Sequence, residues 1–234
     1  MPIRWIVDTE ANLSLWRELS AMPLRVGGRP GMWIADLGGG NGNFARPLTA
    51  NGARLLSIDV ERAALEGAPT RGVRPVAGSA LDLPLKTGSL DGLVGRAVLH
   101  HVPDALDAAL QEVRRVVKPG GLVLIQEPTN GNTLGNFARK RFPTERHDPH
   151  ERPLPLDAYE GATRRHLEVL EVRPFFLLSY LTPHVVARLP PNRRRLGRAI
   201  AHALAMWDER LLAALPGLRA RAAYVSILAR RPTR

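Results

Sequence analysis

The stretch Trp33–Phe44, which reads Trp-Ile-Ala-Asp-Leu-Gly-Gly-Gly-Asn-Gly-Asn-Phe, decides how the rest of the chain is organised. An apolar run leads through Asp36 into three successive glycines, and an apolar segment with helical character begins at Phe44. This order predicts a strand, a tight turn and a helix N-terminus. Glycine allows positive φ and close approach of the backbone to a ligand, and a helix N-terminus offers unpaired N–H groups and the positive end of the helix dipole. The turn is therefore predicted to hold the polar or anionic part of a nucleotide-like ligand.

Two kinds of ligand compete for this turn. Residues 40–45 fit the dinucleotide fingerprint G-x-G-x-x-G/A. Residues 36–42 fit a second pattern, an acidic residue followed by G-x-G-x-G, which is formed by Asp36, Gly38, Gly40 and Gly42. The second pattern resembles the first motif of class I S-adenosylmethionine (SAM) methyltransferases. The resemblance implies that the carboxylate organises the loop and receives the methionine ammonium of SAM, whereas a pyrophosphate gains nothing from it. A glycine-rich loop that binds nothing is the third alternative.

A second acidic residue, Asp59, ends the next predicted strand, residues 54–60. It lies 19 residues after Gly40, close to the ~20 typical of a carboxylate that binds ribose hydroxyls. Asp59, with Val60 beside it, therefore predicts a nucleoside contact, and a solvated surface aspartate is the alternative. NAD and SAM both carry a ribose, so this residue does not separate them.

A third strand is predicted at residues 73–77. The segment that follows it, residues 78–85, reads Gly-Ser-Ala-Leu-Asp-Leu-Pro-Leu. It resembles the adenine-binding segment of the same methyltransferases. The resemblance implies that Asp82 accepts a hydrogen bond from the adenine amino group, and that Ala80 and Leu81 lie against the ring.

Residues 89–104 form a second informative block, with a fourth strand predicted at 90–94 and Arg96 at its end, bordering cofactor and substrate. The following Leu-His-His-Val-Pro-Asp run resembles the type 11 subfamily of small-molecule methyltransferases. His100 or His101 is a candidate general base, because imidazole titrates near neutral pH. The alternative is that both orient the loop and pack beside the cofactor. A metal role is not expected, because adjacent helical residues point apart and no third ligand stands at metal spacing.

Asp104 is predicted to cap a helix over residues 105–117, which ends at Lys-Pro-Gly-Gly, residues 118–121. This helix–KPGG–strand junction is a further feature of the resembling family. Glu127 ends the fifth strand predicted from residue 122, where open α/β sheets place ligand-facing groups. It is a third catalytic candidate, or else a surface residue.

Residues 129–155 lack regular patterning and are expected to form a mobile lid over the substrate. His147, Asp148, His150 and Glu151 resemble a metal cluster in composition, but their spacing is irregular. A sixth strand is predicted at 166–172, and a last strand at 224–229 that the resemblance places antiparallel beside it. Between them, residues 184–215 form a second insertion.

The second insertion holds a basic amphipathic helix predicted from Pro191 to about Ala214. Its apolar stripe consists of Leu196, Ile200, Leu204, Trp207 and Leu211, and arginines lie on the opposite face. Packing on the protein itself is favoured over a pocket wall, a dimer contact or a membrane-surface helix.

The length of 234 residues and the composition indicate one globular domain. Residues 1–30, which include Trp5 and Trp16, are expected to form a cap over the cofactor or to pack on the sheet. No apolar run approaches the ~18 residues of a membrane span, and no signal peptide is recognisable, so a cytoplasmic protein is expected. The net charge of +11 fits nucleic acid, anionic lipid or an acidic substrate, and fits equally an arginine bias of a GC-rich genome.

Together the blocks imply an α/β fold, a Rossmann-like, seven-stranded, mostly parallel sheet with helices on both faces. The implied activity is methyl transfer from SAM, with S-adenosylhomocysteine (SAH) as product, to an oxygen or nitrogen of a small-molecule metabolite. An RNA methyltransferase, an NAD(P)-dependent oxidoreductase and a non-catalytic binding or assembly subunit are the alternatives. A homodimer is possible, and no metal is expected.

Overall fold

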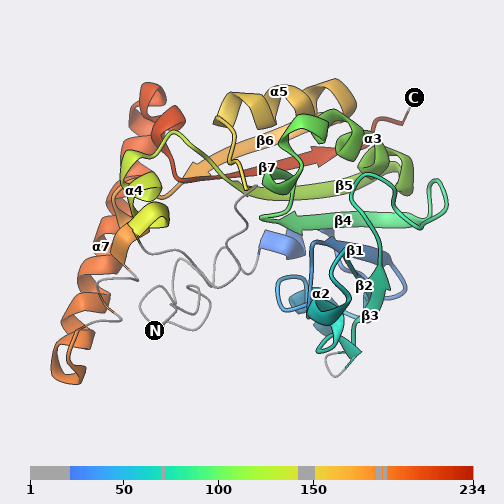
Figure 1. The fold of residues 1–234 in the computed structure, drawn as a ribbon, viewed down its shortest axis with the longest axis horizontal. Helices are drawn as coiled ribbons and strands as arrows, with labels where there is room; N and C mark the ends of the chain where they lie inside the picture. The colour runs from blue at the N-terminus through green and yellow to red at the C-terminus, as the bar shows by residue number, and fades with distance from the viewer. Residues whose placement is uncertain (1–21, 70–71, 142–150, 183–185, 187–188, 234) are drawn as a thin grey trace.

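The computed structural model of the chain describes residues 22–69, 72–141, 151–182, 186 and 189–233 (Figure 1). The expected cap helix with Trp5 and Trp16 lies outside the described residues, as do His147, Asp148 and His150.

The centre of the molecule is one seven-stranded sheet in the order β3-β2-β1-β4-β5-β7-β6. The strands are β1 (Trp33–Leu37), β2 (Arg54–Asp59), β3 (Arg74–Ala77), β4 (Leu90–Arg96), β5 (Val117–Pro128), β6 (Glu168–Phe175) and β7 (Tyr224–Arg230). Strands β1 to β5 pair in parallel, and β7 runs antiparallel between β5 and β6. This arrangement confirms the predicted fold class and the antiparallel last strand.

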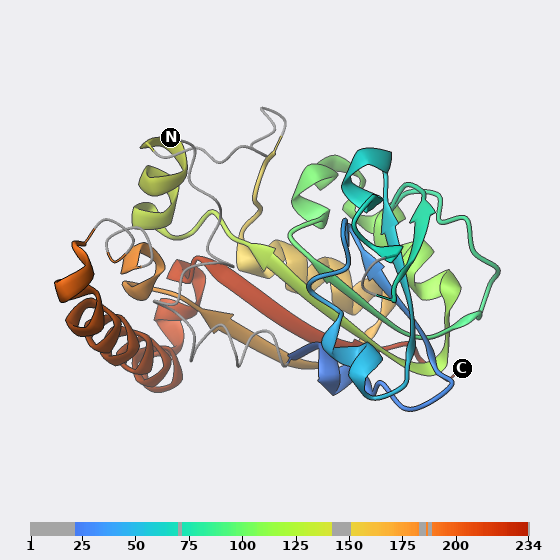
Figure 2. The same cartoon turned by 90° about the horizontal axis from the view of Figure 1, so that it is seen from below.

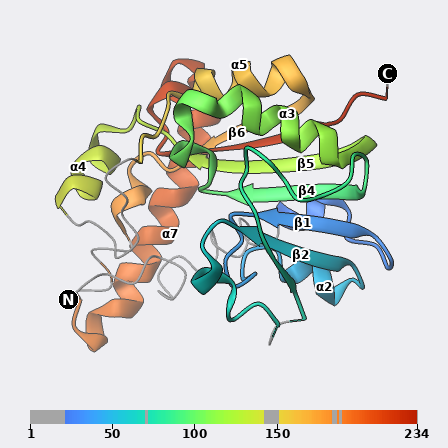
Figure 3. The same cartoon turned by 45° about the vertical axis from the view of Figure 1, so that its right-hand side comes forward.

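Apolar side chains are buried on both faces of the sheet. Successive side chains of a strand point to opposite faces, so neighbouring residues belong to different clusters. Ala35 on β1 and Leu56 on β2 pack in one apolar cluster with α3 (Leu106–Val116) and α5 (Leu156–His166). Ile34 and Leu55, one position earlier, pack in the other cluster. That second cluster contains residues of η3 (Met22–Val26) and α2 (Pro47–Ala50). Figures 1 and 3 show α3 and α5 together over one face of the sheet.

Two further helices stand beyond the edge of the sheet at which β4 and β5 end. They are α4 (Thr133–Arg141) and α7 (Pro191–Ala214), and Figures 1 and 2 both place them at that end. The expectation of irregular chain over residues 129–155 is wrong for α4. Asn132 caps this helix, because its Oδ1 accepts a hydrogen bond from the N–H of Gly135 at 2.6 Å.

Helix α7 has the predicted bounds, but the prediction of its buried face is wrong. Leu196, Ile200 and Trp207 are 65%, 52% and 57% exposed. The buried positions instead carry mostly small side chains, at Gly197, Ala201, Ala205, Asp208 and Leu212. Small residues allow a close approach: a Cβ on Gly197 would lie 2.5 Å from the Leu189 side chain.

Asp208 fastens α7 to the turn at η8 (Ser179–Leu181). Its carboxylate accepts hydrogen bonds from the N–H groups of Leu177, Leu178 and Ser179 and from the Ser179 hydroxyl, at 2.6–3.0 Å. The carboxylate is 2% exposed, so four donors compensate the cost of burying its charge.

Two expected helix starts are also wrong. The helix expected from Phe44 begins only at Pro47 and has four residues, so its dipole adds little to a ligand site at the glycine turn. Asp104 does not cap α3, which begins after the short turn η7 (Pro103–Ala105) and has no side-chain cap. The Asp104 carboxylate pairs instead with the Arg152 guanidinium.

Candidate functional site

The glycine turn follows β1 at the carboxyl end of the strand. Gly38, Gly40 and Gly42 have φ values of +64°, +48° and +75°, a region that favours glycine. A Cβ on Gly38 would also lie 2.8 Å from the Val98 side chain. The turn is held to the next strand, because the N–H of Gly38 donates to the Ile58 carbonyl at 2.8 Å. Its shape therefore depends on these glycines, as the sequence predicts.

Asp36 lies beneath the turn and is 1% exposed. Its Oδ2 accepts a hydrogen bond from the N–H of Ala45 at 3.3 Å, so the carboxylate ties the two ends of the loop together. Burial raises the pKa of Asp36 to about 7, although the charge of Arg96 and the Ala45 hydrogen bond act in the opposite direction. The carboxyl group is therefore half-ionised near neutral pH.

Asp59 meets the same turn from the end of β2. Its Oδ2 accepts a hydrogen bond from the N–H of Gly40 at 3.1 Å, and its Oδ1 accepts one from the N–H of Glu61 at 3.0 Å. Ser57, two residues earlier, donates from Oγ to the Gly40 carbonyl at 2.8 Å. We did not single out Ser57 in the sequence, although a polar residue inside an apolar strand is a usable signal.

The predicted adenine segment lies next to Asp59, because the N–H of Gly78 donates to the Asp59 carbonyl at 3.0 Å. The N–H of Asp82 closes a turn onto the Ser79 carbonyl at 3.2 Å, and its side chain is exposed. Val60 and Leu81 are 79% and 40% exposed, and Ala80 is half-buried. The structure thus brings the expected ribose and adenine contacts to one solvent-facing edge.

Arg96 ends β4 between the glycine turn and the next loop. Its guanidinium carbon lies 4.5 Å from the centre of the Phe44 ring, a cation–π contact. Burial lowers the pKa of Arg96 from its usual value. The next residue, Ala97, has a φ of +55°, which is unfavourable outside glycine. The chain therefore turns sharply here, and strained backbone of this kind is often found at functional sites.

Glu127 determines the shape of that turn and is not a surface residue, since its exposure is 0%. Its Oε1 accepts hydrogen bonds from the N–H groups of Val98 and Leu99, both at 2.9 Å. Its Oε2 accepts from the N–H of His100 at 3.3 Å and lies 2.9 Å from the His100 Nδ1. Four nitrogen groups of three residues contact the carboxylate, so its contacts are those of a positioning group rather than of a base open to substrate.

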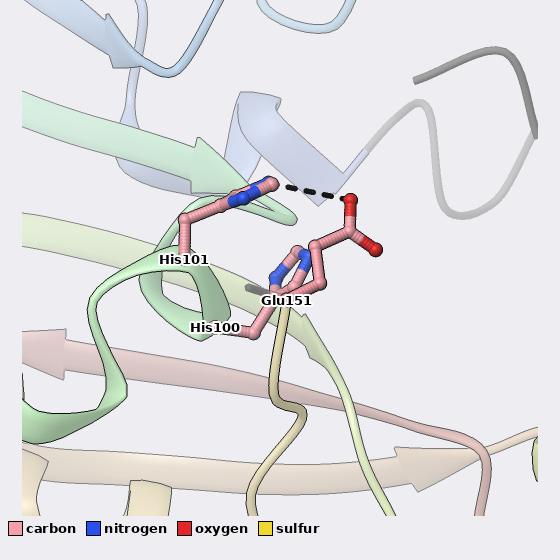
Figure 4. A group of neighbouring side chains, drawn as sticks. All are labelled: His100, His101 and Glu151. Atoms are coloured by element: carbon pink, nitrogen blue, oxygen red, sulfur yellow. Dashed lines mark ion pairs between the residues drawn. The ribbon is translucent and has the colours of Figure 1, made fainter. Parts of the chain in front are cut away.

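The two histidines lie on η6 (Leu99–His101). His100 is 4% exposed and its ring centre lies 4.3 Å from that of His101. The expectation that the adjacent side chains point apart is therefore wrong, because a tight turn rather than an α-helix carries them. Figure 4 shows a third side chain beside them, Glu151, whose Oε1 lies 3.8 Å from the His101 Nε2. The sequence gives no spacing that would bring Glu151 to this position.

Comparison with known proteins finds methyltransferases among the proteins to which this chain is similar. Residues 35–125 match the type 11 methyltransferase family model, described as "Methyltransferase domain". The demethylmenaquinone methyltransferase of Mycobacterium tuberculosis is 35% identical over 118 residues, which cover 49% of each chain. That of Corynebacterium kroppenstedtii is 33% identical over 114 residues, or 49% of this chain and 48% of the relative. The chain thus spans about half the length of the curated relatives it matches.

Solved structures show the same fold at low sequence identity. The [4+2]-cyclase SpnF has a TM-score of 0.65 and 18% identity, and the match covers 93% of this chain and 81% of that one. Geranyl diphosphate C-methyltransferase from Streptomyces coelicolor has a TM-score of 0.62 and 15% identity, with coverage of 93% and 81%.

The sheet order and the glycine turn define a protein with the class I methyltransferase fold. Residues 35–125 are similar to the type 11 family of methyltransferase domains.

Proposed function

We propose that the protein transfers a methyl group from SAM to an oxygen or nitrogen atom of a small-molecule metabolite. The observation that carries the proposal is the glycine turn, whose three positive-φ residues are held between the carboxylates of Asp36 and Asp59. An acidic residue beneath such a turn suits an amino-acid ammonium, and one beside it suits ribose hydroxyls. A pyrophosphate would gain nothing from a carboxylate at the position of Asp36.

The cofactor would lie across the carboxyl ends of β1, β2 and β4, where open α/β sheets bind ligands. Asp59 and Val60 would contact the ribose, and Asp82 would accept from the adenine amino group beside Ala80 and Leu81. SAM supplies an electrophilic methyl group. The protein's part is to place the acceptor in line with it and to remove a proton where the acceptor carries one.

A small-molecule acceptor is supported by relatives named demethylmenaquinone methyltransferase and by the structural neighbour that is a geranyl diphosphate C-methyltransferase. His101 is the candidate general base, because its ring is 38% exposed. His100 and Glu127 would act as positioning residues for that loop. Among the described residues, no helix is both long and apolar enough to cross a bilayer.

A binding protein that does not transfer methyl groups is the second candidate, because this fold does not require methyl transfer: one protein that has it is named a [4+2]-cyclase rather than a methyltransferase. Fold alone does not determine the reaction. Turnover must therefore be measured separately from cofactor binding.

The test begins with calorimetric titration of the purified protein with SAM and SAH, with NADH as control. We expect micromolar binding of both adenosyl ligands, weakened about tenfold or more in Asp59→Asn because a charge-assisted hydrogen bond is lost. Glu66→Gln, an exposed site just after η4 (Arg62–Leu65), is the matched control. Tighter binding of NADH would overturn the proposal.

The second step is transfer of a labelled methyl group from SAM to a panel of small phenols, amines and quinols. Labelled product supports the methyltransferase. SAM binding without product over the whole panel, and without labelled RNA, would favour the binding protein.

A further inference from the structure

Three side chains that could ligate a metal ion converge at the end of β4. One ligand atom each of His100, His101 and Glu151 lies within 4.8 Å of the other two. Figure 4 shows the two rings and the carboxylate grouped together, with His101 directed at Glu151. We propose that these residues bind one divalent first-row transition-metal ion, with Zn²⁺ as the reference ion.

His100 is oriented as a metal ligand. Its Nδ1 lies 2.9 Å from Oε2 of the buried Glu127. A carboxylate only accepts hydrogen bonds, so Nδ1 carries a proton, and in the neutral form of the ring Nε2 is the nitrogen with the lone pair that can bind a metal ion. Metal-binding histidines commonly donate their second ring N–H to a carboxylate in this way, which fixes the tautomer and the ring orientation.

Glu151 is held in place by its neighbour Arg152. The N–H of Arg152 donates to the His100 carbonyl at 3.1 Å, and the Arg152 guanidinium pairs with Asp104. A bridge between Thr129 and Leu154 joins the same segment to the end of β5. The two chain segments that supply the ligands are therefore fastened to each other by contacts that do not involve the ligand atoms.

The donor set and its dimensions fit Zn²⁺ and similar ions. Tetrahedral Zn²⁺ with bonds of ~2.0–2.1 Å keeps its ligand atoms about 3.4 Å apart. The distance of 3.8 Å between His101 Nε2 and Glu151 Oε1 is close to this value. Two imidazoles and one carboxylate suit borderline-soft ions rather than Ca²⁺ or Mg²⁺. Three protein ligands leave a fourth position open, as in catalytic zinc sites.

The position of the cluster gives the ion a role in methyl transfer, and this role rests on the proposed function. A metal-bound His101 has no free lone pair and cannot be the base, so the ion would instead favour loss of the acceptor proton. Val98, which touches the glycine turn at Gly38, lies two residues before His100. A hydroxyl oxygen of the acceptor at the fourth position would release its proton to water more readily, because the ion stabilises the anion. That oxygen would attack the SAM methyl carbon. The carbon–oxygen bond forms as the carbon–sulfur bond breaks, and the bond's electron pair returns to sulfur to give SAH. The acceptor class is then a hydroxyl compound.

The experiment is titration of the chelator-treated full-length protein with Zn²⁺ by calorimetry, and with Co²⁺ by visible absorption. We expect one ion per chain, and an affinity reduced by about 100-fold in both His101→Ala and Glu151→Gln. His202→Ala, an exposed histidine on α7, is the matched control and should bind as the wild type does. Unchanged affinity in both site variants, or no stoichiometric binding by the wild type, would overturn the proposal.

SAH affinity measured on the same variants separates this proposal from the proposed function. Unchanged SAH binding by Glu151→Gln shows that a lost metal affinity is not caused by misfolding. If SAH does not bind the wild type while Zn²⁺ binding still depends on His101 and Glu151, the metal site stands and the cofactor assignment fails. If SAH binds and Zn²⁺ does not, the metal site is refuted alone.

Discussion

Buried Asp36 gives the sharpest prediction of the proposed function, because its ionisation should affect SAM binding if its carboxylate receives the cofactor's ammonium. Burial raises the pKa of this carboxyl group to about 7, and the ammonium of SAM would favour the ionised form. SAM affinity should therefore fall as the pH falls through neutrality. The ionised fraction drops from about 0.9 at pH 8 to about 0.1 at pH 6, so the dissociation constant should rise about tenfold over this range. Calorimetric titration at half-unit pH steps measures the effect.

The Asp36→Asn variant isolates this carboxyl group because it keeps the shape but does not titrate. We expect it to bind SAM more weakly at pH 8 and with little pH dependence. SAH, which carries the same ammonium, should follow the same profile with the wild type, and Glu66→Gln should leave the profile unchanged. A wild-type affinity independent of pH, or an Asn variant that retains the slope, would refute the reasoning.

The stability of the ligand-free protein should show the opposite dependence. A carboxyl whose pKa is 3.8 unfolded and about 7 folded stabilises the fold below pH 3.8, where both states are protonated. This contribution is lost as the pH rises through 7, by at most about 4 kcal/mol. Denaturant unfolding between pH 5 and 8, compared with Asp36→Asn, measures it. A stability difference between the two proteins that stays constant across this range would show that the group is not buried as described.

Three further predictions concern side chains placed by tertiary contacts. Glu127→Gln places an amide N–H₂ group against buried donors and should lower the free energy of unfolding by about 2–4 kcal/mol. Denaturant unfolding measures this loss. An unchanged free energy of unfolding would mean that the carboxylate is not shared among its four donors. Asp208→Ala should lower stability by about 3–5 kcal/mol, because it leaves three backbone N–H groups and a hydroxyl without their acceptor. Trp207→Ser, at an exposed position of α7, should change the free energy of unfolding by less than about 0.5 kcal/mol. Ala201→Leu, on the buried side of α7, should lower it by about 1–3 kcal/mol in the same assay. A larger loss in Trp207→Ser than in Ala201→Leu would show that the apolar stripe is the buried face after all.

The local sequence was sufficient to predict structure wherever the residues that form a pattern and the residues that determine its conformation belong to the same helix, strand or turn. Apolar runs such as residues 33–37 and 54–59 formed the expected strands. Positive φ at Gly38, Gly40 and Gly42 agrees with the prediction from residue type. The order of the blocks also predicted the seven-stranded sheet, because their resemblance to class I methyltransferases implies that fold, and the observed strand order confirms it.

Helix α7 shows where local pattern fails. Its bounds follow from Pro191 and from helical periodicity, but periodicity does not say which partner surface exists. Three of the five stripe residues, Leu196, Ile200 and Trp207, are exposed to solvent. The small residues around Ala201 are buried because they allow close packing. Asp208, a charged residue that any pattern would assign to the surface, is among the anchors of the helix.

The sequence by itself determined the strands, the glycine turn and the residues at each strand end, since these depend on backbone preferences and on periodicity over a few residues. Only the tertiary structure decided what those residues contact. Glu127 is buried against the turn of His100 because β5 ends beneath that turn, which lies 27 residues earlier in the chain. Glu151 reaches the histidines because a distant segment is fastened across that turn. Such contacts join residues that are far apart in the sequence, so a pattern over a few neighbouring residues cannot predict them.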